Sequence, residues 1–360
     1  MTHRNLELNK EYLDPNEDEM ARSLIEHQKA LLGRTYAPGG YRRDFHAKTQ
    51  AAVRGLLICE PNLDERLRFG VFREPRSWPV WIRFSNAGEL AGRDSKRDAR
   101  GMALKLVGVE GEKLLESHRD AQTQDFLFFS PPTFFTPDAQ SFSEFIQIYH
   151  SHSLIRLSWY LIGHFRIAWI ILKSLRLHSN LLELMYYSAT PYMLGPRAVK
   201  HVLRPHKPAT SKMPRRAPEN FLRQRLKEDL ARSEARFDFL IQFQADPYRT
   251  PVEDAAFEWK ERDAPYHKVA TLVIPSQTFD SPEQRQFGEN LSMNPWHCLA
   301  DHRPIGNVNR MRKKLYEAIS GFRRERNAVS VEEPTLQSFE RFGGSFLPET
   351  QRVMEARGES

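Results

Sequence analysis

The chain has 360 residues, of which 40% are hydrophobic, and its formal net charge is +7. This length and apolar content allow one large domain with a buried core. Two cysteines, Cys59 and Cys298, are too few for a disulfide framework and fit a reducing compartment. The polar N-terminus has no apolar signal core, so we expect a cytoplasmic protein. No nucleic-acid motif accompanies the positive charge, which argues against a nucleic-acid partner.

The chain divides into an N-terminal arm (1–39), a main domain (40–325) and a polar C-terminal tail (326–360). The arm contains a predicted helix at 20–32 and ends at a glycine pair. Apolar or alternating runs in the main domain predict strands at 51–59, 80–85, 102–107, 237–243 and 269–274. Helices are predicted at 141–148 and 309–324. Short strands joined by turns predict an α+β fold with an antiparallel barrel of about eight strands.

Residues 150–215 predict a helical insert in the main domain. Residues 154–175 are very apolar, but Arg156, Arg166 and Lys173 interrupt them, which argues against a transmembrane span. On a helical wheel these charges fall within an arc of about 100°, which predicts one basic amphipathic helix. The helix either packs on the barrel or in a dimer contact, which we favour, or contacts a membrane surface and collects lipid-borne substrate. The rest of the insert, including 190–205 and 207–218, predicts a loop.

Two residues near the C-terminus have a spacing with chemical meaning. Arg312 and Tyr316 are four apart in a predicted helix, so their side chains share a face. An arginine beside a phenol favours the ionised form, and a phenolate is a hard ligand suited to ferric iron. Arg323, seven residues further on, lies on the same face. By itself this spacing is more typical of a solvated basic helix.

The order of further segments resembles that of the haem catalase family. The resemblance covers about residues 40–325, with gaps. Five segments carry it: Arg43-Asp44-Phe45-His46-Ala47-Lys48; Trp81-Ile82-Arg83-Phe84-Ser85; Arg97-Asp98-Ala99-Arg100-Gly101, in which Ala99 replaces a proline; Phe134-Phe135 with Phe142 after it; and Arg312, Tyr316 and Arg323.

The resemblance implies haem b with Tyr316 as the axial ligand of the ferric iron. It also implies that His46 is the distal acid and base, and that Ser85 orients its ring. The implied cofactor contacts are Arg43, Arg83, Phe142, Arg312, Tyr316 and Arg323. No Cys-x-x-Cys-His occurs, so covalent c-type attachment is excluded.

Departures from the family pattern bear on function. The distal asparagine is expected just before Phe134, where the candidates are Phe129 and Ser130, and neither is an amide. The residue before the histidine, usually small and branched, is Phe45. The family's C-terminal wrapping segment is also expected to be missing. These departures imply a small catalase-related protein and put fast hydrogen peroxide dismutation in doubt.

Three functions stay open at this point. The first is a peroxidase or weak catalase that acts on hydrogen peroxide or organic hydroperoxides. The second is a fatty-acid hydroperoxide isomerase or lyase, as in allene oxide synthases of this superfamily. The third is a non-enzymatic haem or lipid carrier. Homo-oligomers are compatible with each.

A second candidate metal cluster is weak. His297 and His302 flank Cys298 and Asp301, but the two histidines are five residues apart and face partly away from each other. We interpret them as part of a turn or cap rather than a zinc site.

Overall fold

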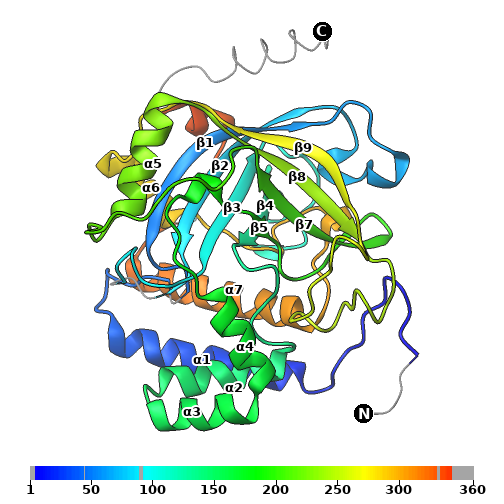
Figure 1. Cartoon of the computed structure of the whole chain (residues 1–360), viewed down its shortest axis with the longest axis vertical. Helices are drawn as coiled ribbons and strands as arrows, with labels where there is room; N and C mark the ends of the chain where they lie inside the picture. The colour runs from blue at the N-terminus through cyan, green and yellow to red at the C-terminus, as the bar shows by residue number, and fades with distance from the viewer. Residues whose placement is uncertain (1–4, 44, 89–91, 331–332, 343–360) are drawn as a thin grey trace.

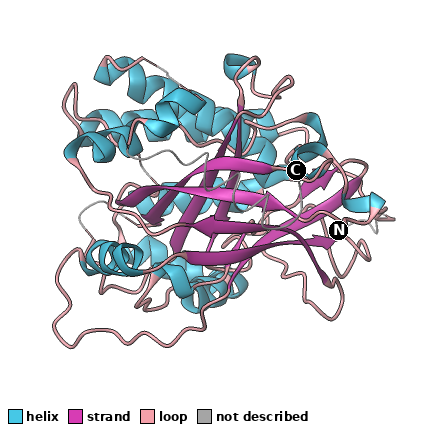
Figure 2. Cartoon of the chain, turned by 90° about the horizontal axis from the view of Figure 1, so that it is seen from above, coloured by secondary structure: helices cyan, strands magenta, loops and turns pink. Residues whose placement is uncertain are grey.

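The computed structural model describes residues 5–43, 45–88, 92–330 and 333–342. Its centre is a closed antiparallel β-barrel with helices on the outside (Figures 1 and 2). Eight strands form the ring in the order β5-β4-β3-β2-β1-β9-β8-β7, which closes because β5 also pairs with β7, and β6 extends the sheet beside β7. The strands are β1 (Thr49–Cys59), β2 (Ser77–Asn86), β3 (Arg100–Val107), β4 (Thr123–Phe129), β5 (Tyr186–Tyr187), β6 (Tyr192–Leu194), β7 (Arg197–Pro205), β8 (Ala235–Phe243) and β9 (Tyr266–Ile274).

The barrel interior is a packed core. Along β8, Phe237, Phe239 and Ile241 alternate with outward residues and are fully buried, as a two-residue period requires. Inside the ring, Phe239 makes edge-to-face contacts with Phe72 and Phe126 at centroid distances of 5.3 and 5.2 Å. Because side chains fill the barrel, a ligand site has to lie on its outside.

The helices cover the barrel in two groups. Helices α1 (Glu17–Thr35), α2 (Ala139–His150) and α7 (Asn307–Asn327) pack on one another at one end of the molecule (Figure 1). Helices α5 (Phe221–Arg232) and α6 (Pro282–Asn290) pack on β1, and α8 (Leu336–Glu340) packs on β2. Helices α3 (Leu154–Gly163) and α4 (Phe165–Ser174) join the first group through α2.

The five predicted strands and the helices predicted at 20–32, 141–148 and 309–324 are confirmed, but the loop predicted at 190–205 is wrong. This segment forms β6 and the whole of β7, the latter a full member of the barrel. Ala198, Val199, Val202 and Leu203 are buried, but so are the polar residues between them, Lys200 and His201. A strand that buries polar residues on its second face loses the apolar alternation by which strands are predicted.

The single helix predicted at 154–175 is also wrong. The chain breaks at His164 (φ −124°, ψ 57°), and α3 and α4 are bent by 110°. The break follows Gly163, a weak helix former, and the His164 ring stacks on Tyr160 at 4.1 Å. Among the described residues no helix taken singly is long and apolar enough to cross a membrane; the bent pair passes on length and composition alone.

The described part of the C-terminal tail is packed rather than free. Phe339 of α8 is buried against Trp81, with ring centroids 5.3 Å apart. Glu333 accepts a hydrogen bond of 2.8 Å from Lys105. A helix of five residues is too short to show periodicity in the sequence. Residues 343–360 of the predicted tail, and Asp44 of the first family segment, lie outside the described residues.

Candidate active site

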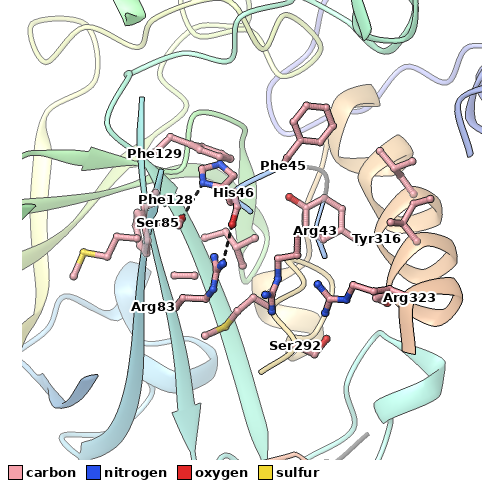
Figure 3. A pocket seen from close by; sticks show the side chains of 18 of the residues that line it. Arg43, Phe45, His46, Arg83, Ser85, Phe128, Phe129, Ser292, Tyr316 and Arg323 are labelled. Carbon is pink, nitrogen blue, oxygen red and sulfur yellow. Dashed lines mark hydrogen bonds between the residues drawn. The ribbon is translucent and has the colours of Figure 1, made fainter. Parts of the chain in front are cut away.

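A cavity lies between the outer face of the barrel and helix α7. Its barrel wall comes from β2, β3, β4 and the segment before β1, and Gln28 of α1 also lines it. Figure 3 shows His46, Ser85 and Phe129 on the barrel side, facing Tyr316 and Arg323 on α7. The α7 wall is formed by Leu315, Tyr316, Ile319, Ser320 and Arg323.

Strand β2 divides its side chains between the core and this cavity. Val80, Ile82 and Phe84 point into the barrel, where all three are fully buried, whereas Arg83 and Ser85 line the cavity. A register slip of one residue would exchange these two sets and place an arginine in the apolar core. Burial of β2 on its inner face therefore fixes both polar residues at the site.

His46 is held from two sides. Its Nδ1 lies 3.0 Å from the hydroxyl oxygen of Ser85, and its carbonyl oxygen accepts a hydrogen bond of 2.8 Å from Arg83. Burial, together with the positive charges of Arg83, Arg312 and Arg43, lowers the pKa of His46 to about 3. The ring is therefore neutral near pH 7, and Ser85 occupies Nδ1, which leaves Nε2 to take up a proton.

Gly101 on β3 makes room for this histidine. A Cβ atom at residue 101 would lie 2.5 Å from His46 Nδ1 and 2.7 Å from Ser85 Oγ. These separations are far inside van der Waals contact, so any side chain would displace the ring or the hydroxyl. The glycine of the 97–101 segment is thus required by the close approach of His46.

Of the two candidates for the distal amide position, Phe129 faces the cavity. Its ring centroid lies 5.2 Å from that of His46, and it lines the cavity wall. Ser130 is engaged elsewhere, because its hydroxyl oxygen accepts a hydrogen bond of 3.0 Å from the backbone N–H of Arg100. The space beside the histidine is therefore bounded by a phenyl ring that offers no hydrogen bond.

The opposite wall carries the Arg312–Tyr316 pair on α7. Arg312 is buried and donates to the Tyr316 hydroxyl at 3.5 Å and to Asn309 and Thr190 at 3.0 and 3.2 Å. Burial alone would lower the pKa of Arg312, but Tyr316 and Tyr192 raise it above its ordinary value. A permanent cation thus lies beside the phenol oxygen.

Three arginines converge at one end of the cavity: Arg43, Arg83 and Arg323. Burial lowers the pKa of all three arginines, that of Arg323 to about 9, and repulsion by neighbouring arginines adds to the effect of burial on Arg83 and Arg323. Among the described residues, the carboxylate beside them is Glu289, which pairs with Arg43 at 3.2 Å. The Nε of Arg83 is buried without a hydrogen-bond partner in the described chain. The cluster has an excess of positive charge and suits an anionic ligand.

Phe142 lies behind the cavity wall rather than on it. Its ring packs against Phe45 and Phe134, with centroids 6.3 and 5.4 Å apart, in the cluster formed by α1, α2 and α7. Phe45, Phe128 and Phe129 are the phenylalanines among the residues that line the cavity. The haem-stacking contact expected of Phe142 therefore stays a prediction. Phe129, which the sequence offered for another position, is a phenylalanine that does line the cavity.

The second histidine cluster is structural. His302 accepts a hydrogen bond of 3.0 Å from the backbone N–H of Val71, whereas His297 lies 2.6 Å from the Thr123 hydroxyl. Ligand atoms of His118, His297 and Glu333 do lie within 4.8 Å of one another. However, the ammonium group of Lys105, 2.8 Å from Glu333, already supplies the positive charge there.

Comparisons with known proteins bear on the family and on the fold. Residues 41–158 match the family model named Catalase. The fold is similar to a bacterial catalase (TM-score 0.63, 18% identity, 89% of this chain and 62% of that one). It is also similar to a fungal catalase (TM-score 0.63, 16% identity, 88% of this chain and 63% of that one). A third similar structure is catalase A from Saccharomyces cerevisiae (TM-score 0.62, 17% identity, 95% of this chain and 70% of that one). The chain thus spans under two thirds of the length of the first two. Residues 41–158 therefore match the catalase family model, and the described fold of the chain is that of catalases.

Proposed function

We propose that the chain binds haem b in this cavity and acts on peroxides by breaking their O–O bond. One observation carries the proposal: a neutral histidine and an arginine-paired tyrosine face the same cavity from opposite walls. A flat macrocycle placed between them would have a proton acceptor on one face and a hard anionic ligand on the other.

The residues of the cavity fit such a group. Tyr316 is placed to bind ferric iron, and the apolar side chains Leu315 and Ile319 flank it on α7. The surplus charge of Arg43, Arg83 and Arg323, with one unpaired buried nitrogen, suits two carboxylates such as the haem propionates. When bound, the haem supplies the iron and the redox chemistry of peroxide cleavage.

The chain's own contribution is proton transfer and orientation. Neutral His46 accepts the proton of an incoming hydroperoxide at Nε2 and returns it to the oxygen that leaves as water or alcohol. Ser85 holds Nδ1 so that the ring keeps its orientation through both steps. Phe129 gives no hydrogen bond to the peroxide, and loss of one such donor typically costs about 10²–10³ in rate. This favours peroxidase action or weak catalase activity over fast dismutation.

Fatty-acid hydroperoxides are the second candidate substrate, with isomerase or lyase chemistry. Aromatic side chains continue outward from the cavity wall. Phe129 contacts Phe134 at 6.5 Å, and Phe134 stacks on Phe135 at 4.8 Å, so apolar surface extends beyond the haem position. An apolar approach suits a long acyl chain better than it suits hydrogen peroxide.

Reconstitution with haem tests the proposal. We expect a high-spin ferric spectrum and consumption of peroxide, measured in parallel with hydrogen peroxide and linoleate hydroperoxide. Oxygen release would indicate catalase activity, and loss of the conjugated diene with little oxygen would indicate lipid hydroperoxide chemistry. His46→Ala should keep the spectrum and lose about 10²–10⁴ in turnover. Haem binding without turnover in the unchanged protein would indicate a carrier, and no Soret band would refute the cofactor assignment.

A further inference from the structure

Helices α3 and α4 carry a large exposed apolar surface. Its seven side chains, called here the apolar patch, are 57–81% exposed, whereas folded proteins rarely leave such a contiguous group in water. The members are Leu154, Ile155, Trp159, Ile162, Phe165, Trp169 and Leu172. Figure 1 places α3 and α4 beside α2, at the end of the molecule away from α5 and α6.

Contacts with the rest of the domain hold α3 and α4 in place, so the position of the apolar patch is fixed. On α3, Tyr160 is buried and its hydroxyl donates to the Ser141 carbonyl of α2 at 3.2 Å. On α4, Ile167 is buried and Arg166 pairs with Asp254 at 2.8 Å. These contacts use one side of each helix, which leaves the patch pointing away from the domain.

The charged residues of the segment that carries the patch have one sign. Residues 145–182 contain four basic residues, Arg156, Arg166, Lys173 and Arg176, and no Asp or Glu. Arg156, Lys173 and Arg176 are exposed, and the Lys173 ammonium lies 4.9 Å from the Trp169 ring centroid. Exposed tryptophans next to lysine and arginine are typical of segments that lie in the headgroup region of a bilayer.

We propose that α3 and α4 bind the surface of an anionic lipid bilayer, with the apolar patch inserted among the acyl chains and the basic residues at the headgroups. The bend of 110° gives a wedge that can enter one leaflet without crossing it. A second copy of the chain fits less well, because a two-fold contact through this patch would bring the same cations together with no carboxylate between them.

The apolar patch lies at the end of a series of aromatic contacts that begins at the cavity wall. Aromatic contacts run from the cavity wall to α3: Phe135 meets Phe145 at 5.2 Å, and Phe145 meets Tyr160 at 6.1 Å. Phe135 is in turn joined to Phe129 through Phe134. The membrane contact would therefore lie at the outer end of the apolar surface that begins beside His46. The surface-binding proposal itself does not depend on haem or on peroxide chemistry.

Vesicle binding by the full chain tests the proposal. We expect co-flotation with vesicles of phosphatidylcholine containing phosphatidylglycerol and weaker binding to phosphatidylcholine alone. Lipids brominated on the acyl chains should quench tryptophan fluorescence. Only Trp159 and Trp169 are exposed among the six tryptophans, since Trp78, Trp81, Trp259 and Trp296 are buried. Quenching would thus report insertion of the patch without any mutation.

Variants distinguish vesicle binding through the apolar patch from nonspecific binding. Trp159→Ser combined with Trp169→Ser should lower vesicle binding roughly tenfold or more, because it removes apolar surface available for insertion. Replacement of Arg156, Lys173 and Arg176 by glutamine should abolish the preference for phosphatidylglycerol and its salt dependence. The matched control is Leu336→Ser on α8, 46% exposed and outside the patch, which should bind like the unchanged chain. Circular dichroism and thermal unfolding check that each variant is folded.

Two results would overturn the proposal. One is the absence of both flotation and quenching with anionic vesicles. The other is a stable dimer of the unchanged chain that the tryptophan double variant converts to a monomer, because a second copy would then be the occupant of the patch. Light scattering without vesicles measures the oligomeric state in the same preparations.

Discussion

The Nδ1 atom of His46 lies 3.0 Å from the hydroxyl oxygen of Ser85, although 39 residues separate them in the chain. The contact exists because β2 turns Ser85 outward and because residue 101 has no side chain to intervene. Burial and three arginines keep the histidine neutral, so the hydroxyl has to set its orientation rather than its charge. Each of these features gives a prediction for the proposed peroxide chemistry.

Loss of the Ser85 hydroxyl should slow turnover without loss of haem. In Ser85→Ala the imidazole loses its partner at Nδ1, and we expect kcat/KM for peroxide to fall about fivefold, as for one hydrogen bond of about 1 kcal/mol. The matched control is Ser130→Ala, which removes a hydroxyl one residue beyond β4 that bonds the backbone N–H of Arg100. Equal effects of the two substitutions on kcat/KM would contradict the orienting role of Ser85.

Removal of the phenol oxygen should weaken haem binding. Tyr316→Phe keeps the ring on α7 but leaves the iron without its anionic ligand and Arg312 without one acceptor. We expect loss of tight haem binding and an altered spectrum in any haem that stays, measured by titration of the Soret band. The control is the same substitution at another tyrosine, Tyr41→Phe, which lies two residues before Arg43 in the sequence. A fully loaded Tyr316→Phe protein with an unchanged spectrum would exclude Tyr316 as the ligand.

A methyl group at residue 101 should damage the site directly. Gly101→Ala places a carbon 2.5 Å from His46 Nδ1, and such overpacking typically costs about 1–3 kcal/mol of folding free energy. We expect lower thermal stability and reduced peroxide turnover in the same protein. The control is Gly33→Ala in α1, where no described atom lies within 4 Å of the added carbon and helix propensity favours alanine. If both variants are equally stable and active, the close approach at Gly101 is unimportant.

The depressed pKa of His46 gives a pH dependence with a defined sign. Between about pH 3 and its ordinary value of 6.5, the unfolded chain binds a proton at His46 that the folded chain does not. This contribution therefore destabilises the fold progressively as pH falls below 6.5, and His46→Gln should reduce the loss. Turnover that depends on the neutral ring should stay level from pH 8 to pH 5, where an unperturbed histidine would become charged. A rate profile that falls with a midpoint near 6.5 would contradict the buried, neutral histidine.

The sequence predicted the barrel and the site segments better than it predicted their surroundings. The order of 43–48, 81–85 and 312–323 predicted that His46, Ser85 and Tyr316 share one site, and the three residues do line one cavity. The period of β2 and that of α7 position Ser85 and Tyr316, whereas His46 lies in a turn before β1. The sequence could not choose between Phe129 and Ser130, since they lie where β4 ends and its alternation stops. Nor could it find β7, in which Lys200 and His201 are buried. The break at His164 follows a single glycine, Gly163, inside an apolar run, and this signal was too weak to divide the predicted helix.

Phe129 offers a direct test of which of the two proposed peroxide substrates the cavity favours. Its ring, 5.2 Å from that of His46, bounds the space where an amide would hydrogen-bond the peroxide. Phe129→Asn restores that donor and removes an apolar ring, so oxygen release from hydrogen peroxide should rise by about tenfold or more while turnover of linoleate hydroperoxide falls. Oxygen electrode and diene absorbance measurements on the haem-loaded variant give the two rates. Ser130→Asn, beside it but bonded to Arg100, should leave their ratio unchanged. If Phe129→Asn shifts neither rate, the ring does not govern the choice between the two substrates, and the missing amide is not what limits dismutation.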